Sequence, residues 1–418
     1  MISLGILTYN TAVVNSFSFQ VVTTAPGETV TLPILAGGAS YVQNFTAYWG
    51  DTTSSEITAY NDPDRIHTYA VAGTYDIQLI GISQYFCYSS TTVTERNKVK
   101  KLLGFNGDIG FKVLNFYGCI NLNTIVSFGT LVSLINVSYL FQNCTSLPAI
   151  INGMFDGCPN ILYFSDSFAG CTNASFTSIP TDLFRYNTAV TTFTNIFNGC
   201  TKITSIPTDL FRYNVSVTSF QASFQNCSKI TSIPTDLFRY NSLVTNFSYT
   251  FNGCSLLTVI PIDLFRYNVS VTNFTYVFGN CNALTTLPNG LFDYNVSVTS
   301  FQAAFYQCAV LATLPVYLFR YNTAVTNFYY AIASCPKLQL NSDIFYAVGE
   351  QGTRFLNKSM NFYGCFDRSS FTGIIGIAPD LWNCNFGTGT PTKTLCFGGA
   401  GNNILSLLNY LLIPVAWK

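Results

Sequence analysis

The 14 cysteines are the residues with the most evident capacity for chemistry, because thiolates bind metals and act as nucleophiles. Ten of them keep a nearly constant spacing, which is 27 residues through the middle of the chain. The regularly spaced ones are Cys200, Cys227, Cys254, Cys281, Cys308 and Cys335, and Cys119, Cys144, Cys171 and Cys365 continue the register less regularly. No C-x-x-C pair occurs, so no metal site is expected. Equivalent side chains in stacked coils point the same way, which is poor disulfide geometry, and we expect buried free thiols.

Four further cysteines lie outside this register. They are Cys87, Cys158, Cys384 and Cys396. Of these, Cys384 and Cys396 are close enough in sequence to pair with each other, and the sequence leaves that question open.

Charged side chains form a second periodic set. Arginine recurs at Arg185, Arg212, Arg239, Arg266 and Arg320, and aspartate stands three residues before the first four of them. Stacked coils would align both into rows, which predicts a structural surface row of ion pairs that fixes the coil register. The alternative is a row of arginines that binds an anionic glycan, since a planar guanidinium suits carboxylates.

The sequence offers few residues that could catalyse a reaction. The chain has one histidine, His67, and no glycine-rich phosphate-binding loop. A histidine-activated nucleophile therefore cannot form away from His67. We expect a protein without catalytic residues, cofactor or bound metal.

These residues belong to an internal repeat, most regular from 179 to 335. Proline and tyrosine keep the same step of 27 residues as cysteine, as in Pro207 and Pro234 or Tyr213 and Tyr240. A fixed period in the range of 20 to 50 residues indicates a solenoid, in which each unit buries its apolar side against its neighbours. Apolar residues such as Phe220 are expected to point inward.

Between the constant aromatic positions of each unit lie residues that vary. Variable residues on a constant scaffold are typical of a binding face, and tyrosine offers contact area with a hydrogen bond at low entropic cost. The predicted ligand-binding residues are Gln221, Tyr249, Tyr276, Gln302, Tyr329 and Tyr330. The alternative is that these positions are solvated or packed on a sister subunit.

The repeat phrase F-x-x-C-x-x-L-T-S-I/L, followed by N-x-x-V-T-x-F, resembles leucine-rich repeats of the BspA-like class. The resemblance is closest to the variant in mycoplasma surface lipoproteins and in phage proteins, and it covers more than 200 residues. It implies recognition of a surface without identifying that surface.

The N-terminal part reads as short alternating strands, such as residues 17–23 and 29–34. Its W-G-D phrase at residues 49–51 and its H-T-Y-x-x-x-G-T-Y phrase at residues 67–75 resemble the PKD domain, an immunoglobulin-like sandwich. Thr52 stands where that family usually has glycine, which puts the local turn in doubt. The resemblance implies a spacer or interaction module, with His67 in a structural role.

The predicted fold is therefore mostly β, an immunoglobulin-like sandwich followed by a leucine-rich-repeat solenoid of about ten coils of ~27 residues. The predicted order is an N-terminal arm (1–16), the PKD-like domain (17–90), a junction and N-terminal cap (91–116), the repeats (117–370) and a C-terminal cap (371–418).

Composition narrows the classes of function. Only 9% of residues are charged and the formal net charge is zero, which disfavours nucleic acid as a partner. No apolar run reaches the length of a membrane span, and the first 15 residues make a poor secretory signal.

Joined to a PKD-like domain, this repeat is typical of phage proteins. We therefore expect a non-enzymatic virion surface protein, in a tail fibre, beside the tail or decorating the capsid. Its expected partners are other virion proteins at the N-terminal domain, a host surface protein or glycan at the repeats, and further copies of itself. The alternatives are an adhesin of a bacterial cell surface and a purely structural subunit of a shell or fibre.

Overall fold

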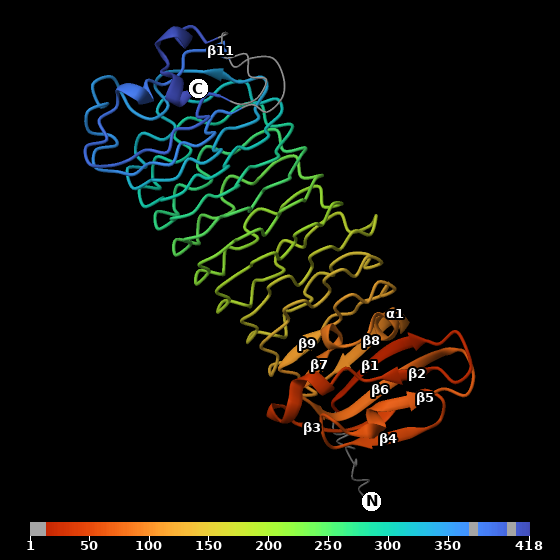
Figure 1. Cartoon of the computed structure of the whole chain (residues 1–418). Helices are drawn as coiled ribbons and strands as arrows, with labels where there is room; N and C mark the ends of the chain where they lie inside the picture. The colour runs from red at the N-terminus through yellow and green to blue at the C-terminus, as the bar shows by residue number, and fades with distance from the viewer. Residues whose placement is uncertain (1–13, 368–374, 399–406) are drawn as a thin grey trace, which may run out of the picture.

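The computed structural model describes residues 14–367, 375–398 and 407–418. The chain is elongated, with a small β-sheet region at the N-terminal end and a long stack of irregular coils that ends near the C-terminus (Figure 1). The fold is mostly β, and α1 (Val93–Lys98) is the α-helix of the described residues. Most of the predicted N-terminal arm lies outside these residues.

The N-terminal region contains nine strands and three short 3-10 helices. The strands are β1 (Ser16–Val22), β2 (Thr29–Thr31), β3 (Gln43–Tyr48), β4 (Ser54–Ile57), β5 (Ile66–Thr68), β6 (Thr74–Ser83), β7 (Tyr85–Cys87), β8 (Val99–Asn106) and β9 (Val113–Asn115). The helices are η1 (Leu35–Ser40), η2 (Pro63–Arg65) and η3 (Tyr88–Ser90). One sheet has five strands in the order β4-β3-β6-β1-β8, its pairs antiparallel, and β2 pairs with β5 in a separate two-stranded sheet.

An aromatic cluster packs the two motifs of the N-terminal region, residues 49–51 and 67–75, against each other. Trp49 is fully buried, and its ring stacks on His67 with the centroids 4.7 Å apart. The Tyr69 hydroxyl donates to the Trp49 carbonyl at 2.8 Å. Nε2 of His67 lies 2.7 Å from Oδ2 of Asp51. His67 is therefore held on both sides by structural contacts, in line with its predicted role.

The turn after Asp51 has an uncommon backbone. Thr52 has a φ of 74°, in the left-handed region that disfavours β-branched residues. The turn persists because both the backbone N–H and the hydroxyl of Thr53 donate to Oδ1 of Asp51. The sequence departs from the usual glycine here, and the chain keeps the turn at a cost in backbone energy.

The sheet region continues directly into the coils. Strand β8 pairs with β1, so the five-stranded sheet extends to Asn106, beyond the predicted domain boundary at residue 90. On its other edge Lys101 forms a parallel bridge with Thr124 of the first coil. Strand β7 pairs in parallel with β9, whose Val113 bridges to Asn136. The predicted junction thus extends two ladders from the sheet region into the array.

The coils themselves are built from turns joined by single bridges. One parallel ladder runs through every coil, with one bridging residue each, as in Asn246 to Asn273. Its rungs are Val113, Asn136, Tyr163, Thr192, Ser219, Asn246, Asn273, Ser300, Asn327, Asn361 and Thr392. Near the C-terminus a second ladder widens into the paired strands β10 (Gln339–Leu340) and β11 (Ile375–Gly376).

Phenylalanine and cysteine fill the interior of the coils. Rings stack from coil to coil in columns, for example Phe224 on Phe251 with centroids 5.7 Å apart. All 14 cysteines are buried and free, Cys384 and Cys396 included. From Cys144 to Cys335 each thiol in the predicted register donates to a phenylalanine carbonyl of the preceding coil, with donor–acceptor distances of 3.0–3.3 Å.

A column of buried asparagines forms the second polar link between coils. Its members are Asn187, Asn214, Asn241, Asn268, Asn295 and Asn322. The side-chain Nδ2 of Asn241 donates to the carbonyls of Phe211 and Asn214 in the preceding coil at 3.1 and 2.9 Å. Cys158, outside the cysteine register, heads this column, because its carbonyl accepts from Nδ2 of Asn187.

The stack extends further than the predicted repeat. Thr392 is a rung of the long ladder, and Phe397 stacks on Phe366 at 5.3 Å. Trp417 is almost fully buried over Phe362 at the end of the core. The C-terminal part also contains the short helices η4 (Leu381–Asn383), η6 (Tyr410–Leu412) and η7 (Val415–Trp417), the last of which includes Trp417. The described part of the predicted C-terminal cap thus adds one more coil before it closes the stack.

The asparagine column makes a direct prediction. Asn241→Ala should lower the free energy of unfolding by about 1–3 kcal/mol, since two buried hydrogen bonds are lost. Asn241→Asp should cost more, because its acceptor-only side chain would face two carbonyl oxygens. Urea-induced unfolding measures both, with the exposed neighbour variant Ser242→Ala as the control. Equal stability of Asn241→Ala and the wild type would contradict the role of the column.

The strained turn makes a second prediction. Thr52→Gly should raise the free energy of unfolding by about 0.5–1 kcal/mol. The backbone strain of threonine in the left-handed conformation is larger than the extra conformational entropy that glycine loses on folding. Thr53→Gly should instead destabilise the turn, because it removes a hydroxyl that binds Asp51. Thermal unfolding of the two variants tests this, and a lower melting temperature for Thr52→Gly would contradict it.

Candidate functional site

The candidate binding face is created by a turn that every coil makes just after its rung of the long ladder. The residue three positions after the rung has a positive φ in coil after coil, as in Asn195 (55°), Ala222 (54°) and Tyr276 (53°). Its N–H donates to the next coil, so Tyr276 N lies 2.8 Å from the Gln302 carbonyl. Asparagine tolerates this conformation better than most residues. Tyrosine does not share that advantage.

Three of the predicted tyrosines occupy this unfavourable position. They are Tyr249, Tyr276 and Tyr330, with φ values of 60°, 53° and 52°. A bulky residue in the left-handed region is an outlier that costs about 1–2 kcal/mol. Strain that the fold tolerates repeatedly is a feature of functional sites.

The tyrosine rings contact one another in an unbroken series. Tyr249 and Tyr276 stack with centroids 4.9 Å apart and planes 8° apart. Tyr306 follows edge-on at 6.0 Å from Tyr276 and 6.1 Å from Tyr330. We call the series the tyrosine row, and it consists of Tyr249, Tyr276, Tyr306, Tyr329, Tyr330 and Tyr363.

Two members of the row, Tyr306 and Tyr363, were not among the predicted site residues. Tyr306 fills the space above Ala303, which is fully buried at the position that Tyr276 holds one coil earlier. Tyr363 stacks on Tyr329 at 5.4 Å and meets Tyr330 edge-on at 5.5 Å. The sequence could have indicated both tyrosines. In each of these coils a small residue, alanine or glycine, occupies the turn position, and a tyrosine lies close to it in the chain.

The predicted glutamines flank the row in a different way. Oε1 of Gln302 accepts a hydrogen bond from Nδ2 of Asn327 at 3.2 Å, and Oε1 of Gln221 accepts from Asn246 at 3.3 Å. Gln302 lies one coil before Tyr329 at the equivalent repeat position, two residues after its rung, whereas Gln221 lies before the first tyrosine of the row. The six predicted residues share one face. Neither glutamine belongs to the series of contacting tyrosine rings.

Two hydroxyls of the row stay protonated at neutral pH. Burial raises the pKa of Tyr276, with smaller contributions from Tyr249 and Tyr306. Burial and then the neighbouring Tyr363 hydroxyl raise the pKa of Tyr330 to about 12. The row thus presents half-buried aromatic rings with polar hydroxyls, which suit contact with sugars or with a protein surface.

A different face of the coils carries the predicted arginines. Each of Arg185, Arg212, Arg239 and Arg266 lies over the tyrosine ring of the next coil, at 5.1–5.6 Å. Arg212, Arg239 and Arg266 form ion pairs within their own coils, as Arg212 does with Asp209 at 3.4 Å. Contacts between coils therefore come from arginine on tyrosine. We call this set, with Tyr186, Tyr213, Tyr240, Tyr267 and Tyr294, the arginine–tyrosine column.

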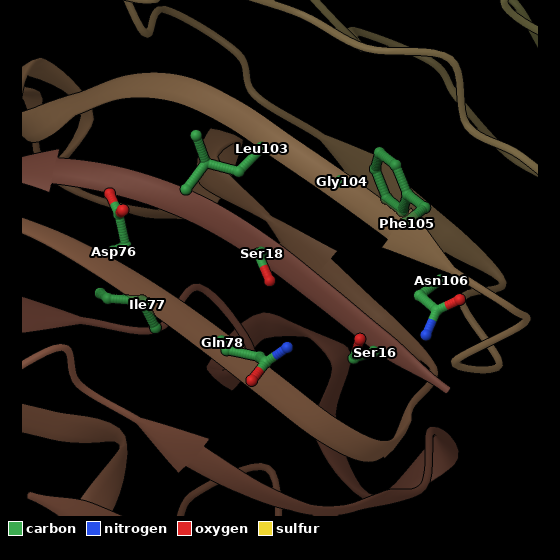
Figure 2. A pocket seen from close by; sticks show the side chains of 9 residues that line it. All are labelled: Ser16, Ser18, Asp76, Ile77, Gln78, Leu103, Gly104, Phe105 and Asn106. Carbon is green, nitrogen blue, oxygen red and sulfur yellow. The ribbon is translucent and has the colours of Figure 1, made fainter. Parts of the chain in front are cut away.

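A hollow of about 530 Å³ lies on the outer face of the N-terminal sheet. Figure 2 shows its lining, which comes from the neighbouring strands β6, β1 and β8. Its one titratable residue, Asp76, accepts a hydrogen bond from Nε2 of Gln20 at 2.8 Å. Shallow and lined mostly by neutral side chains such as Ser18 and Gln78, it offers no acid–base pair.

The thiols are not poised for reaction. Burial raises the pKa of Cys254 to about 12 and that of Cys227 well above its ordinary value. In residues 14–367, 375–398 and 407–418, no group of three histidine, cysteine or acidic side chains could hold a metal ion. Within the same ranges no helix is long and apolar enough to cross a membrane.

Comparison with known proteins identifies the repeat. The family described as "Mycoplasma protein of unknown function, DUF285" matches residues 114–238, 191–316 and 218–344, which together exceed half of the chain. The chain belongs to this family. The DUF285 matches cover the asparagine column and most of the long ladder and of the tyrosine row, so these features lie largely within the family repeat.

Two solved structures are similar to parts of this DUF285 protein. A leucine-rich repeat protein from Bacteroides ovatus has 14% identity, with a TM-score of 0.33, over 71% of this chain and 86% of its own. The Toll–Spatzle complex of Drosophila has 13% identity, with a TM-score of 0.23, over 66% of this chain and 42% of the other. No curated protein sequence matches the chain.

Glycines next to the row provide a structural test. A Cβ added to Gly364, whose φ is 57°, would lie 2.4 Å from Cε1 of Tyr330. Gly364→Ala should therefore displace that ring and lower the free energy of unfolding by about 1–3 kcal/mol. Gly352→Ala is the matched control, because its added Cβ would meet nothing within 4 Å.

The measurements are near-ultraviolet circular dichroism, which reports on the packing of tyrosine rings, and urea-induced unfolding. Gly364→Ala should change both, and Gly352→Ala neither. An unchanged tyrosine signal in Gly364→Ala would show that the Tyr330 ring does not pack as described.

Proposed function

We propose that this chain is a non-enzymatic surface protein of a phage virion, in a tail fibre, beside the tail or decorating the capsid. Its tyrosine row binds a protein or glycan of the host surface. The observation that carries the proposal is the recurrence of tyrosine at a strained turn position, with rings in continuous contact. Stability alone favours asparagine or glycine there, so the tyrosines indicate selection for what they present.

In this proposal the N-terminal region is a PKD-like, immunoglobulin-like domain that attaches to other virion proteins or spaces the array from the particle. The buried Trp49, its stacking on His67 and the Tyr69 hydroxyl bond support the resemblance. The two ladders that pass from this region into the coils would hold the array at a fixed angle. A rigid mount suits the presentation of a binding face.

Two alternatives use the same architecture. The first is an adhesin of a bacterial cell surface, which the Mycoplasma origin in the family description favours. The second is a purely structural subunit, in which the tyrosine row packs on another copy of the chain. In both, and in the virion proposal, the row is a contact surface, and the alternatives differ in what it contacts.

The test is a double variant of the stacked pair. Tyr249→Ala with Tyr276→Ala should weaken binding to whole bacterial cells and to arrayed bacterial polysaccharides by about tenfold or more, since buried aromatic anchors dominate contact energies. Tyr240→Ala with Tyr267→Ala, in the arginine–tyrosine column, is the matched control and should bind normally. Fluorescently labelled full-length protein serves for both assays.

The outcome also separates the alternatives. Unchanged binding by the folded Tyr249/Tyr276 variant would refute the row as the binding face. If that variant instead changes its oligomeric state in light scattering, the row is a subunit interface and the structural alternative holds. Imaging of phage particles, to see whether they carry this chain, then distinguishes the virion proposal from the alternative of a bacterial surface adhesin.

A further inference from the structure

A cavity lies at the C-terminal end of the arginine–tyrosine column, away from the tyrosine row. It has a volume of about 340 Å³ and is lined by Arg320, Tyr321, Thr323, Glu350, Arg354 and Lys358, among others. We call it the end pocket. It lies between the coil of Arg320 and the next coil, which contributes Glu350, Arg354 and Lys358.

The charge balance changes at this pocket. In the preceding coils each arginine follows an aspartate by three residues, as Arg239 follows Asp236 at 3.5 Å. Before Arg320 the equivalent residue is Tyr317, so no carboxylate accompanies it. Glu350 of the next coil pairs with Arg320 instead, with Nη2 and Oε1 2.6 Å apart. Three cations and one carboxylate line the pocket, which gives an excess of two positive charges.

Arg354 is the most unusual of these cations. It stands where the preceding six coils have a buried asparagine, since its Nη2 donates to the carbonyls of Phe319 and Asn322 at 2.9 and 3.1 Å. A neutral asparagine makes the equivalent bonds in the coil before. The arginine is only 6% exposed, and its Nη1 has no hydrogen-bond partner.

Burial disfavours the charged forms of two of these cations, Arg354 and Lys358. Burial lowers the pKa of Arg354 to about 10. Burial, and then the charge of Arg354, lower the pKa of Lys358. Nζ of Lys358 has the Thr323 carbonyl as a partner, which leaves its charge without a carboxylate. An anion bound among these groups would relieve their repulsion.

We propose that the end pocket binds the carboxylate of an acidic sugar. Charge-assisted hydrogen bonds from a guanidinium to a carboxylate are strong, the partnerless Nη1 of Arg354 is a donor for one, and Lys358 adds a second positive charge. The half-exposed ring of Tyr321 and the threonine hydroxyls at the mouth suit the face and hydroxyls of a sugar ring. The volume is within the range of small-ligand sites.

The proposal is tested by calorimetric titration of the full chain with glucuronate, glucose and inorganic phosphate. Glucuronate should bind, and glucose and phosphate should bind at least about tenfold more weakly, since each lacks either the charge or the sugar ring. Absence of glucuronate binding, or phosphate binding as tight as that of glucuronate, would overturn the assignment.

Two variants connect the binding to the pocket. Lys358→Met keeps the stem and removes the charge, and should weaken glucuronate binding by about tenfold. Glu350→Gln removes the competing carboxylate and should strengthen it. Lys337→Met, at an exposed lysine outside the pocket lining, is the control for a lost charge. Glucuronate binding that Lys358→Met leaves unchanged would refute the site.

This site goes beyond the proposed function and does not depend on it. The Tyr249/Tyr276 double variant should bind glucuronate normally. Loss of cell binding in that variant and loss of glucuronate binding in Lys358→Met are therefore independent results.

Discussion

Each coil of this protein shares many hydrogen bonds with its neighbours. The backbone N–H groups of alternate residues, such as Phe220, Ala222 and Phe224, donate to the next coil, and buried side chains add further bonds between coils. The buried asparagine amide does so by donating to two carbonyls of the preceding coil, and the cysteine thiol does so by donating to a third. Because these groups point along the stack, a lone coil would leave them unpaired. The array is stable only as a continuous stack.

This dependence explains both ends of the stack. At the N-terminal end, strands β7 and β8 offer ladder edges to the first coils, so the sheet region acts as the first layer of the array. At the C-terminal end, Trp417 covers the exposed rings of the last coil. In the asparagine column, Cys158 and Arg354 take the end positions. The residues that break the repeat are therefore the ones that terminate its contacts.

Much of this arrangement could be predicted from the sequence, because the repeat is a local pattern. The period, the inward phenylalanines and the buried free cysteines all follow from residues 27 positions apart. The position of β8 did not follow, since pairing with β1 is a long-range contact that no period reveals. The asparagine column did not follow either, since a polar residue at a repeat position does not reveal that its amide binds the preceding coil.

The candidate site was predictable to a similar degree. Position and variability indicated Tyr249, Tyr276, Tyr329 and Tyr330. Tyr306 was missed, because it reaches the row from another part of the coil to fill the space above Ala303. Whether rings touch depends on side-chain direction, which spacing along the chain does not give. The stacking of arginine on the tyrosine of the next coil was missed for the same reason.

The low charge of the chain constrains how such a surface can bind. The net charge is zero, and the arginines of the column are largely matched by aspartates of the same coil, so electrostatic steering of a partner is weak. As the proposed binding face, the tyrosine row would derive its affinity from contact area, and a row of six rings is small compared with a typical protein interface. In the proposed virion role, presentation of many copies on one particle would compensate for a weak single site, because each bound copy raises the effective concentration of the next. A neutral stack joined to its N-terminal sheet by two ladders would suit that use, because it would hold the proposed binding face at a constant distance from its point of attachment.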